Sequence, residues 1–444
     1  MTIETVPGTN IQYNLIAFDA AGNERENDPH GVMSQRFIGL LSNEPITDVF
    51  IFSHGWLGDV PAAKRQYNLW VKAMADQTKD IERMRQIRPN FHCLLIGLHW
   101  PSQPWGDEEL KPSEVSFETT SSKNANPLEE TVDRYAKRIA DTETSREALR
   151  TIFKAAEKDL DPQRLPREVS NAYKVLDQEA GLGHDGAGAA PGDDREAFNP
   201  DLEYGAVKQE PDNRRIPILG GLLAPLRTLS FWKMKDRARQ FGEKAGFKLL
   251  KDLHQASSND VRFHLMGHSF GSIVVSASLS GPDRKGQLVR PVNSVALVQG
   301  ALSLWSYCSD IPVRRGTEGY FHNIIAQGKV AGPIITTQSK FDTALSKMYP
   351  LGAGLADQVS FDPDDLDESP TYGAVGTFGA RGPGIESTFS DMLPVADSYQ
   401  FESRKIYNLR SSKFICEGIG SGGAHSDIYK PEVAHAIWEA AMTS

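Results

Sequence analysis

Five consecutive residues, Gly267-His268-Ser269-Phe270-Gly271, have the types and the spacing of a catalytic serine turn. An apolar run, 261–266, precedes them, and a stretch of small residues, 272–279, follows them. This order predicts a strand, a sharp turn and a helix, with the serine at the tip of the turn. Flanking glycines suit such a turn because a Cβ at either position would crowd the packed strand and helix. We expect Ser269 to be a nucleophile; the alternative left open is a glycine-rich turn with an ordinary serine.

A serine nucleophile needs a general base, and His425 is the candidate. It lies in a glycine-rich stretch, 421–427, after the last expected strand and before a helix that begins near Pro431. A loop at that place lets a histidine reach across the end of a sheet to the serine. The alternative is a surface histidine at a helix entry. His435 falls inside the final helix and is expected to be structural, and His268 is expected to pack or hydrogen-bond locally.

The base in turn needs an acid that orients it, and Asp342 is the candidate. It follows an expected strand, 333–337, and functional groups of α/β folds lie just past the carboxyl ends of strands. Asp310, which follows the preceding strand 292–298, is the rival. Asp427 is too near the base in sequence to serve easily as its partner, and we expect it to cap the following helix instead.

Backbone N–H groups are expected to stabilise the oxyanion, and each such donor is worth about 10²–10³ in rate. One is the N–H of Phe270, directly after the nucleophile. The other is expected where a buried strand runs into Ser53-His54-Gly55-Trp56-Leu57, with Trp56 as the first choice and Leu57 as the next. His54 is expected to brace this loop by hydrogen bonding.

The elements that must position these residues can be predicted from near-continuous apolar runs that alternate with helical patterns. Such runs are typical of a mostly parallel sheet that helices cover on both faces. The expected strands are 11–18, 46–52, 91–98, 261–266, 292–298, 333–337 and 405–409, with 414–415 closing the series.

Two segments interrupt this pattern. About 160 residues separate Trp100 from Val261, far more than one crossover needs. We therefore expect a core of residues 1–102 and 231–444, an inserted cap or lid at 103–230, and a second insertion at 350–401 within the core. The apolar stretch 222–232 either packs the cap onto the core or lines a mouth for lipid.

Composition limits the remaining possibilities. The chain has 444 residues and a net charge of −10, with 39% hydrophobic and 24% charged residues, so we expect a globular protein with a sizeable core. The absence of a basic tract argues against nucleic-acid binding. Three scattered cysteines argue against a disulfide scaffold and favour a reducing compartment. The histidines show no metal-binding motif, so no metal and no cofactor are expected.

Neither a secretory signal peptide nor a membrane span is expected. The first ten residues lack the pattern of a secretory signal, and no window of 18 apolar residues exists. A cytoplasmic location is therefore expected, although export without a signal peptide, peripheral membrane contact and the oligomeric state stay open.

Four blocks of this chain resemble the signature blocks of the α/β-hydrolase superfamily: Phe52–Trp56, Gly267–Gly271, Ser339–Asp342 and Gly423–His425. The first two are most similar to lipase and esterase branches. Three blocks, Ser339–Asp342, Tyr372–Gly376 and Ala424–Ile428, also resemble a little-characterised bacterial group of predicted hydrolases. The resemblance implies an eight-stranded, mostly parallel sheet flanked by helices. It also implies cleavage of carboxylic esters, lipid esters among them, through an acyl-enzyme. The oversized segment 103–230 departs from the family, so no substrate preference is carried over.

Two other functions remain compatible with the sequence. One is an amidase, peptidase or thioesterase on the same fold. The other is a non-catalytic binding protein that keeps the fold, because a fold does not fix a function.

Overall fold

The computed structural model describes residues 3–26, 31–56, 59–102, 127–182, 190–209, 221–345, 369–418 and 422–443. Parts of the expected cap and of the second insertion lie outside these residues, as does Leu57, the second choice for the oxyanion donor.

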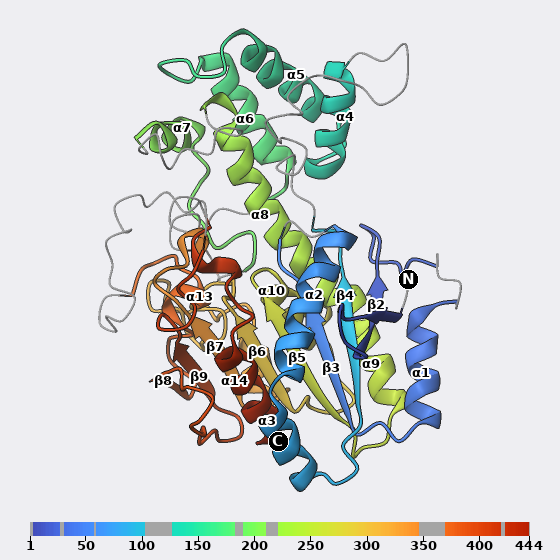
Figure 1. The fold of residues 1–444 in the computed structure, drawn as a ribbon. Helices are drawn as coiled ribbons and strands as arrows, with labels where there is room; N and C mark the ends of the chain where they lie inside the picture. The colour runs from blue at the N-terminus through green and yellow to red at the C-terminus, as the bar shows by residue number, and fades with distance from the viewer. Residues whose placement is uncertain are drawn as a thin grey trace.

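A nine-stranded, mostly parallel sheet forms the centre of the molecule (Figure 1). Its strands are β1 (Ile3–Thr5), β2 (Gln12–Ala17), β3 (Asp48–Ser53), β4 (Cys93–His99), β5 (Arg262–His268), β6 (Ser294–Val298), β7 (Ile334–Gln338), β8 (Ser387–Asp391) and β9 (Ile406–Arg410). They are ordered β1-β2-β4-β3-β5-β6-β7-β9-β8, and only the β1–β2 pair is antiparallel. Ser53 lies opposite Gly267 in the β3–β5 register, so the loop after β3 begins beside the serine turn.

The sequence predicted the mostly parallel sheet correctly but not all of its strands. Seven of the expected strands are present among the described residues, and the edge strands β1 and β8, which the sequence did not predict, bring the number to nine. Strand β8 falls inside the segment 350–401, which was expected to be an insertion and for which no strand was predicted, and it pairs in parallel with β9. The prediction that 414–415 extends the sheet is wrong, since these residues form a turn.

Helices cover both faces of the sheet (Figure 1). One face carries α1 (Met33–Asn43), α9 (Phe247–Ala256) and α10 (Gly271–Ser280), and the other carries α2 (Val60–Ala75), α3 (Thr78–Ile87) and α14 (Pro431–Met442). Alternate side chains of each strand feed the two cores: in β3, Val49 and Ile51 join one core, and Phe50 and Phe52 join the other. None of the described helices is long and apolar enough to cross a bilayer.

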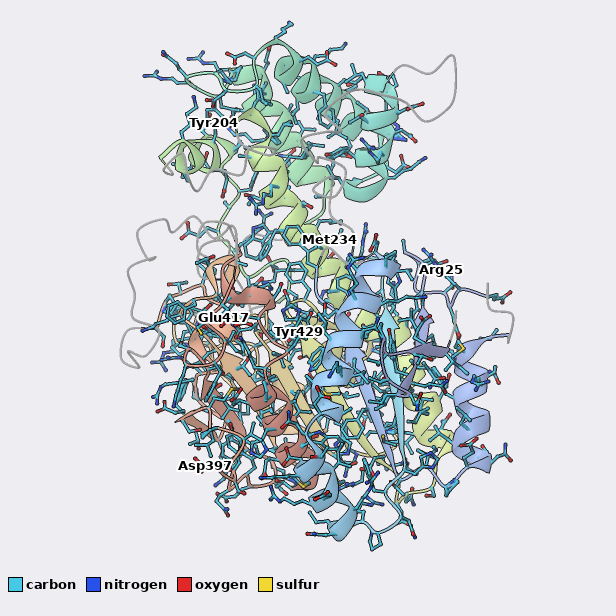
Figure 2. All side chains as sticks on the ribbon, viewed as in Figure 1. Arg25, Tyr204, Met234, Asp397, Glu417 and Tyr429 are labelled. Atoms are coloured by element: carbon cyan, nitrogen blue, oxygen red, sulfur yellow. The ribbon has the colours of Figure 1, made fainter. Side chains whose placement is uncertain are left out.

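A layer of helices lies above the carboxyl ends of the strands, within the segment expected to be a cap (Figure 1). It contains α4 (Pro127–Ile139), α5 (Glu143–Lys158), α6 (Arg167–Glu179), α7 (Pro200–Gln209) and the 3-10 turn η3 (Gly221–Leu223). Helix α8 (Ala224–Phe241) joins this layer to the core, because it contacts α6 and α7 as well as α10. Met234, labelled in Figure 2, lies buried on α8 where the helix passes from one layer to the other.

Helix α8 continues through a π-helical turn, η4 (Gly242–Gly246), into α9. Two glycines let this turn press against α10. A Cβ on Gly242 would lie 2.5 Å from Val274 O, and one on Gly246 would lie 2.1 Å from Ser278 Oγ. Helix α10, which begins after Ser269, is thus packed directly against the helix that enters the cap.

Candidate active site

The serine turn between β5 and α10 is a strained elbow. Ser269 has a φ of +55°, a left-handed conformation that non-glycine residues rarely adopt. Its glycine neighbours are required by contact: a Cβ on Gly271 would lie 2.1 Å from Ser53 O, and one on Gly267 would lie 2.4 Å from the Gly271 backbone. The expected strand, turn and helix are all present, and the Ser269 side chain stands at the carboxyl edge of the sheet.

Three side chains expected to act together form one hydrogen-bonded chain. Ser269 Oγ lies 2.8 Å from His425 Nε2, and His425 Nδ1 lies 2.7 Å from Asp342 Oδ2. An ionised carboxylate can only accept, so His425 carries its proton on Nδ1 and its Nε2 is free to accept from the serine hydroxyl. Asp342 is fully buried, Ser269 is 5% exposed, and the His425 side chain is 16% exposed.

The loops that carry the acid and the base are paired with each other. Asp342 and Gly423 form an antiparallel bridge, and Ala424 N–H donates to Phe341 O at 2.8 Å. Gly423 has a φ of +54°, and a Cβ there would lie 2.4 Å from Phe341 O. The 3-10 turn η7 (Ala424–Ser426) then presents His425 to the serine. The spacing between acid and base is therefore set by backbone pairing as well as by their side chains.

The expected oxyanion loop lies directly against Ser269. A Cβ on Gly55 would lie 2.8 Å from Ser269 Cβ, so only glycine fits between the loop and the elbow. The backbone N–H groups of Trp56 and Phe270 border this contact, and within the described part of the chain neither donates a hydrogen bond. Two free N–H donors beside a buried serine are the arrangement that a developing oxyanion requires.

His54 braces this loop as a neutral ring. Its Nδ1 lies 2.8 Å from Gly55 O, its Nε2 accepts from Trp100 N–H at 3.3 Å, and its ring stacks on Trp100 with centroids 5.6 Å apart. Burial, together with the nearby His99, lowers the pKa of His54 to about 3. A ring that stays neutral can donate from Nδ1 and accept at Nε2 at once, which is the bonding that the structure requires.

His268 ties the elbow to the loop of the base. Gln66 Nε2 lies 3.2 Å from His268 Nδ1, and His268 Nε2 lies 2.9 Å from His425 O. Because the carbonyl can only accept, Nε2 carries the proton. Burial, together with the adjacent His425, lowers the pKa of His268 to about 3. His268 does form hydrogen bonds, but neither partner is local in sequence, since Gln66 and His425 lie 202 and 157 positions away.

The cap helix contacts both residues that offer the N–H donors. The Phe231 ring of α8 lies 5.8 Å from Trp56 and 5.1 Å from Phe270, and Trp56 and Phe270 lie 5.8 Å apart, all measured between centroids. Phe231 and Phe270 are buried. This end of the stretch 222–232 therefore packs the cap onto the core at the edge of the candidate site.

The alternative acids do not reach the base. Asp310 accepts from Gly316 N–H at 2.6 Å and lies 3.6 Å from Arg315, so it closes a local turn. Asp427 accepts from the backbone N–H groups of two loop residues, 416 and 417. The prediction that Asp427 caps the last helix is wrong, because that helix has no side-chain cap.

One group among the described residues has the spacing of metal ligands: Asp80, His435 and Glu439. Both nitrogens of His435 are engaged, Nδ1 with Asp80 at 2.8 Å and Nε2 with Asp397 O at 2.7 Å. Burial alone would lower the pKa of His435, but these partners and Glu439 raise it above its ordinary value. Arg83 pairs with both carboxylates. The group is therefore an ion network that joins α3 to α14.

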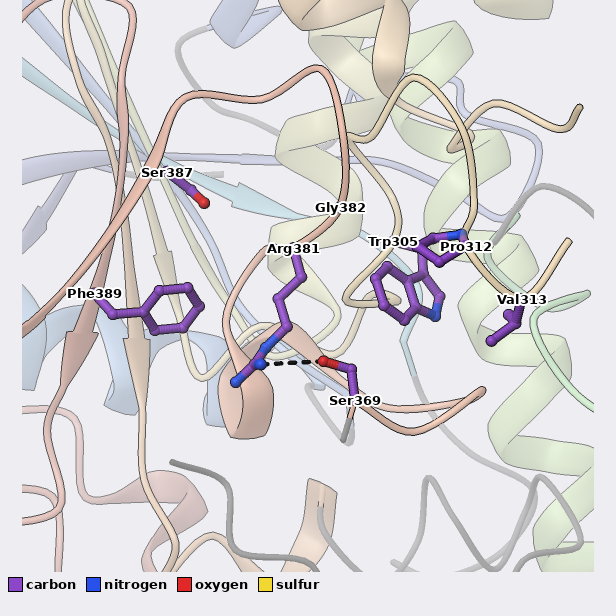
Figure 3. Close-up of a pocket in the computed structure, with 8 residues that line it drawn as sticks. All are labelled: Trp305, Pro312, Val313, Ser369, Arg381, Gly382, Ser387 and Phe389. Carbon is purple, nitrogen blue, oxygen red and sulfur yellow. Dashed lines mark hydrogen bonds between the residues drawn. The ribbon is translucent and has the colours of Figure 1, made fainter. Parts of the chain in front are cut away.

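A pocket of about 400 Å³ lies apart from the triad, none of whose residues lines it (Figure 3). Its lining residues are Trp305, Pro312, Val313, Ser369, Arg381, Gly382, Ser387 and Phe389. Arg381 donates to Phe378 O at 2.7 Å and to Ser369 Oγ at 3.0 Å, and its guanidinium lies 4.9 Å from the centroid of Phe389. These contacts tie the short helix α13 (Val375–Phe378) to β8 and give Arg381 a structural role.

One residue of the site was missed by sequence analysis. Gln299, directly after β6, donates from Nε2 to Asp342 Oδ2 at 3.1 Å. A signal existed, since a polar side chain that ends a buried apolar strand lies at the edge where α/β folds place functional groups.

Comparison with known proteins found no matching family model, no similar curated protein and no similar solved structure.

Proposed function

We propose that this protein is a serine hydrolase of the α/β-hydrolase fold that cleaves carboxylic esters through an acyl-enzyme. The observation that carries the proposal is the continuous chain from Ser269 Oγ to His425 Nε2, at 2.8 Å, and from His425 Nδ1 to Asp342 Oδ2, at 2.7 Å. Chain order supports the fold assignment, because nucleophile, acid and base follow one another as Ser, Asp and His. The left-handed elbow at Ser269 and the parallel sheet support it as well.

The proposed reaction begins with proton transfer. His425 Nε2 takes the hydroxyl proton as Ser269 Oγ attacks the ester carbonyl, and Asp342 stabilises the imidazolium that forms. The N–H groups of Phe270 and Trp56 hold the oxyanion. His425 then gives its proton to the departing alcohol. Water, activated by the same histidine, hydrolyses the acyl-enzyme and frees the serine.

An apolar acyl group suits the residues beside the proposed oxyanion donors. The three aromatic rings of Trp56, Phe231 and Phe270 are in mutual contact there, and Trp56 is the only one of them that is not buried. This observation favours esters with a hydrocarbon acyl chain, those of lipids included, over esters of charged acids.

The test combines a fluorophosphonate probe with p-nitrophenyl esters of increasing acyl length. Wild-type protein should be labelled and should turn over the esters, whereas Ser269→Ala should be unlabelled and reduced to background with an unchanged melting temperature. Ser272→Ala is the matched control, because this neighbouring buried hydroxyl donates to Gly267 O and does not contact His425. Labelling of Ser269→Ala at the wild-type rate would reject the proposal.

The same assay separates the alternatives. Faster turnover of matched amides or thioesters than of esters would assign an amidase, peptidase or thioesterase. Folded wild-type protein that is neither labelled nor active on any of these substrates would favour a non-catalytic binding protein.

A further inference from the structure

We propose that Gln299 is a positioning residue of this site, which fixes the carboxylate of Asp342 and couples it to the backbone of Ser269. The inference rests on the proposed function, and it deepens that function by adding a side chain outside the triad.

The backbone of Gln299 has a left-handed conformation that is unfavourable for a residue other than glycine. Five non-glycine residues of the described chain have a positive φ, and three of them, Asp283, Arg284 and Arg404, are exposed. The two buried ones are Ser269, at +55°, and Gln299, at +47°. Glycine would adopt this conformation without strain. A buried glutamine in this conformation is therefore strained, and strained residues of this kind cluster at functional sites.

Both ends of the Gln299 side-chain amide are hydrogen-bonded, and this fixes its orientation. Thr337 Oγ1 accepts from Gln299 N–H at 3.0 Å and donates its own proton to Gln299 Oε1 at 3.2 Å. Since Oε1 is taken by this hydroxyl, Nε2 must face Asp342 Oδ2, which lies 3.1 Å away. The acid thus has a donor that holds it whether or not the histidine is present.

The segment around Gln299 also holds the nucleophile. Ser269 N–H donates to Val298 O at 3.1 Å, and Ala301 N–H donates to Ser269 O at 3.1 Å. The residues on both sides of Gln299 thus fix the main chain of the serine, and its side chain fixes the acid. This connection bypasses His425, so it sets the space in which the imidazole must fit.

The experiment measures the second-order rate constant of fluorophosphonate labelling against pH. Gln299→Met keeps the length of the side chain and removes the donor; Gln299→Asn keeps an amide that is too short to reach Asp342 and tolerates the left-handed backbone. Gln327→Met, at an exposed glutamine, is the control. We expect both Gln299 variants to lose about tenfold or more in rate, as a small misplacement of reacting groups would cause. The acid limb of the profile should move to higher pH, because a carboxylate with one donor fewer attracts the imidazolium proton more strongly.

A purely structural role predicts a different outcome. Both Gln299 variants would then melt at lower temperature, but the rate per folded molecule and the pH profile would stay as in wild type, and the inference would be overturned. If wild-type protein is neither labelled nor active on esters, amides or thioesters, the proposed function fails on its own. The low-field proton resonance of the His425 Nδ1–H group still tests Gln299 in that case: it should shift or broaden in Gln299→Met, and an unchanged resonance would reject the positioning role.

Discussion

Replacing Asp342 with asparagine should nearly abolish activity, because no orientation of the new amide satisfies its surroundings. The carboxylate accepts from three donors: Leu345 N–H on Oδ1 at 3.0 Å, and Gln299 Nε2 at 3.1 Å and His425 Nδ1 at 2.7 Å on Oδ2. Asparagine offers one oxygen and one NH₂ group. The NH₂ group must therefore occupy either the Oδ1 or the Oδ2 position, where it faces another hydrogen-bond donor. This costs about 1–3 kcal/mol.

Both orientations also harm the chemistry. If the oxygen of residue 342 faces His425, the tautomer survives but the negative charge that stabilises the imidazolium is gone. If the NH₂ group faces His425, the ring proton moves to Nε2, and the base can no longer accept from Ser269. We expect kcat/KM to fall by about 10³–10⁴, the size of effect known for such a change in a Ser-His-Asp triad. This corresponds to about 4–5 kcal/mol of transition-state stabilisation.

The assay for Asp342→Asn is ester turnover together with fluorophosphonate labelling, corrected for folded protein by thermal melting. Asp310→Asn, at the rival acid whose carboxylate accepts from Gly316 N–H in a local turn, is the matched control and should stay within about twofold of wild type. Turnover of Asp342→Asn above about one tenth of wild type would refute the reasoning. So would an inactive Asp310→Asn whose melting temperature is unchanged.

Two further predictions concern stability. Gly271→Ala should lower the free energy of unfolding by about 3 kcal/mol or more, because its Cβ would lie 2.1 Å from Ser53 O; denaturant titration checks this, and a loss under about 1 kcal/mol would contradict it. Burial, together with Arg290, lowers the pKa of His254 from 6.5 to about 3. Between pH 6.5 and pH 3 the imidazole is therefore protonated in the unfolded state but neutral in the folded state. Stability should therefore fall as the pH drops below 6.5, and this group should cost about 2 kcal/mol at pH 5. His254→Leu should shrink the difference in stability between pH 7.5 and pH 5 by that amount, and an unchanged difference would exclude this histidine as a cause of acid sensitivity.

The sequence was sufficient to predict the strands whose pattern of apolar residues matches their burial in the fold. The central strands are buried on both faces and appear as unbroken apolar runs, as in β3, where all six residues are buried. The two missed strands lack that signal. Strand β1 has three residues. Strand β8, Ser387–Asp391, lies at the sheet edge with no residue fully buried, so its composition resembles that of a loop. Edge strands are set by pairing with a neighbour, which a pattern along one segment does not contain.

The residues of the candidate site also differ in how far the sequence alone indicates them. Ser269, Asp342 and His425 were found because each combines a reactive residue type with a position after a strand or in a glycine-rich loop. The residues that hold them were harder to find. Gln299 and Gln66 are ordinary residue types, and their roles depend on contacts across 43 and 202 positions of sequence. Such contacts are products of topology, since only the sheet order brings these segments to one edge.

The path of helix α8 argues against treating the cap as a separable lid. The helix begins at Ala224 in the cap and ends at Phe241 in the core, so the expected boundary at residue 230 falls within a continuous helix. Its Phe231 touches both Trp56 and Phe270, the residues with the proposed oxyanion donors. Its continuation through Gly242 presses on α10, the helix that begins directly after the nucleophile. A rigid helix cannot move at one end without moving at the other, so a displacement of the cap that tilts α8 would disturb both the proposed oxyanion donors and the support of Ser269.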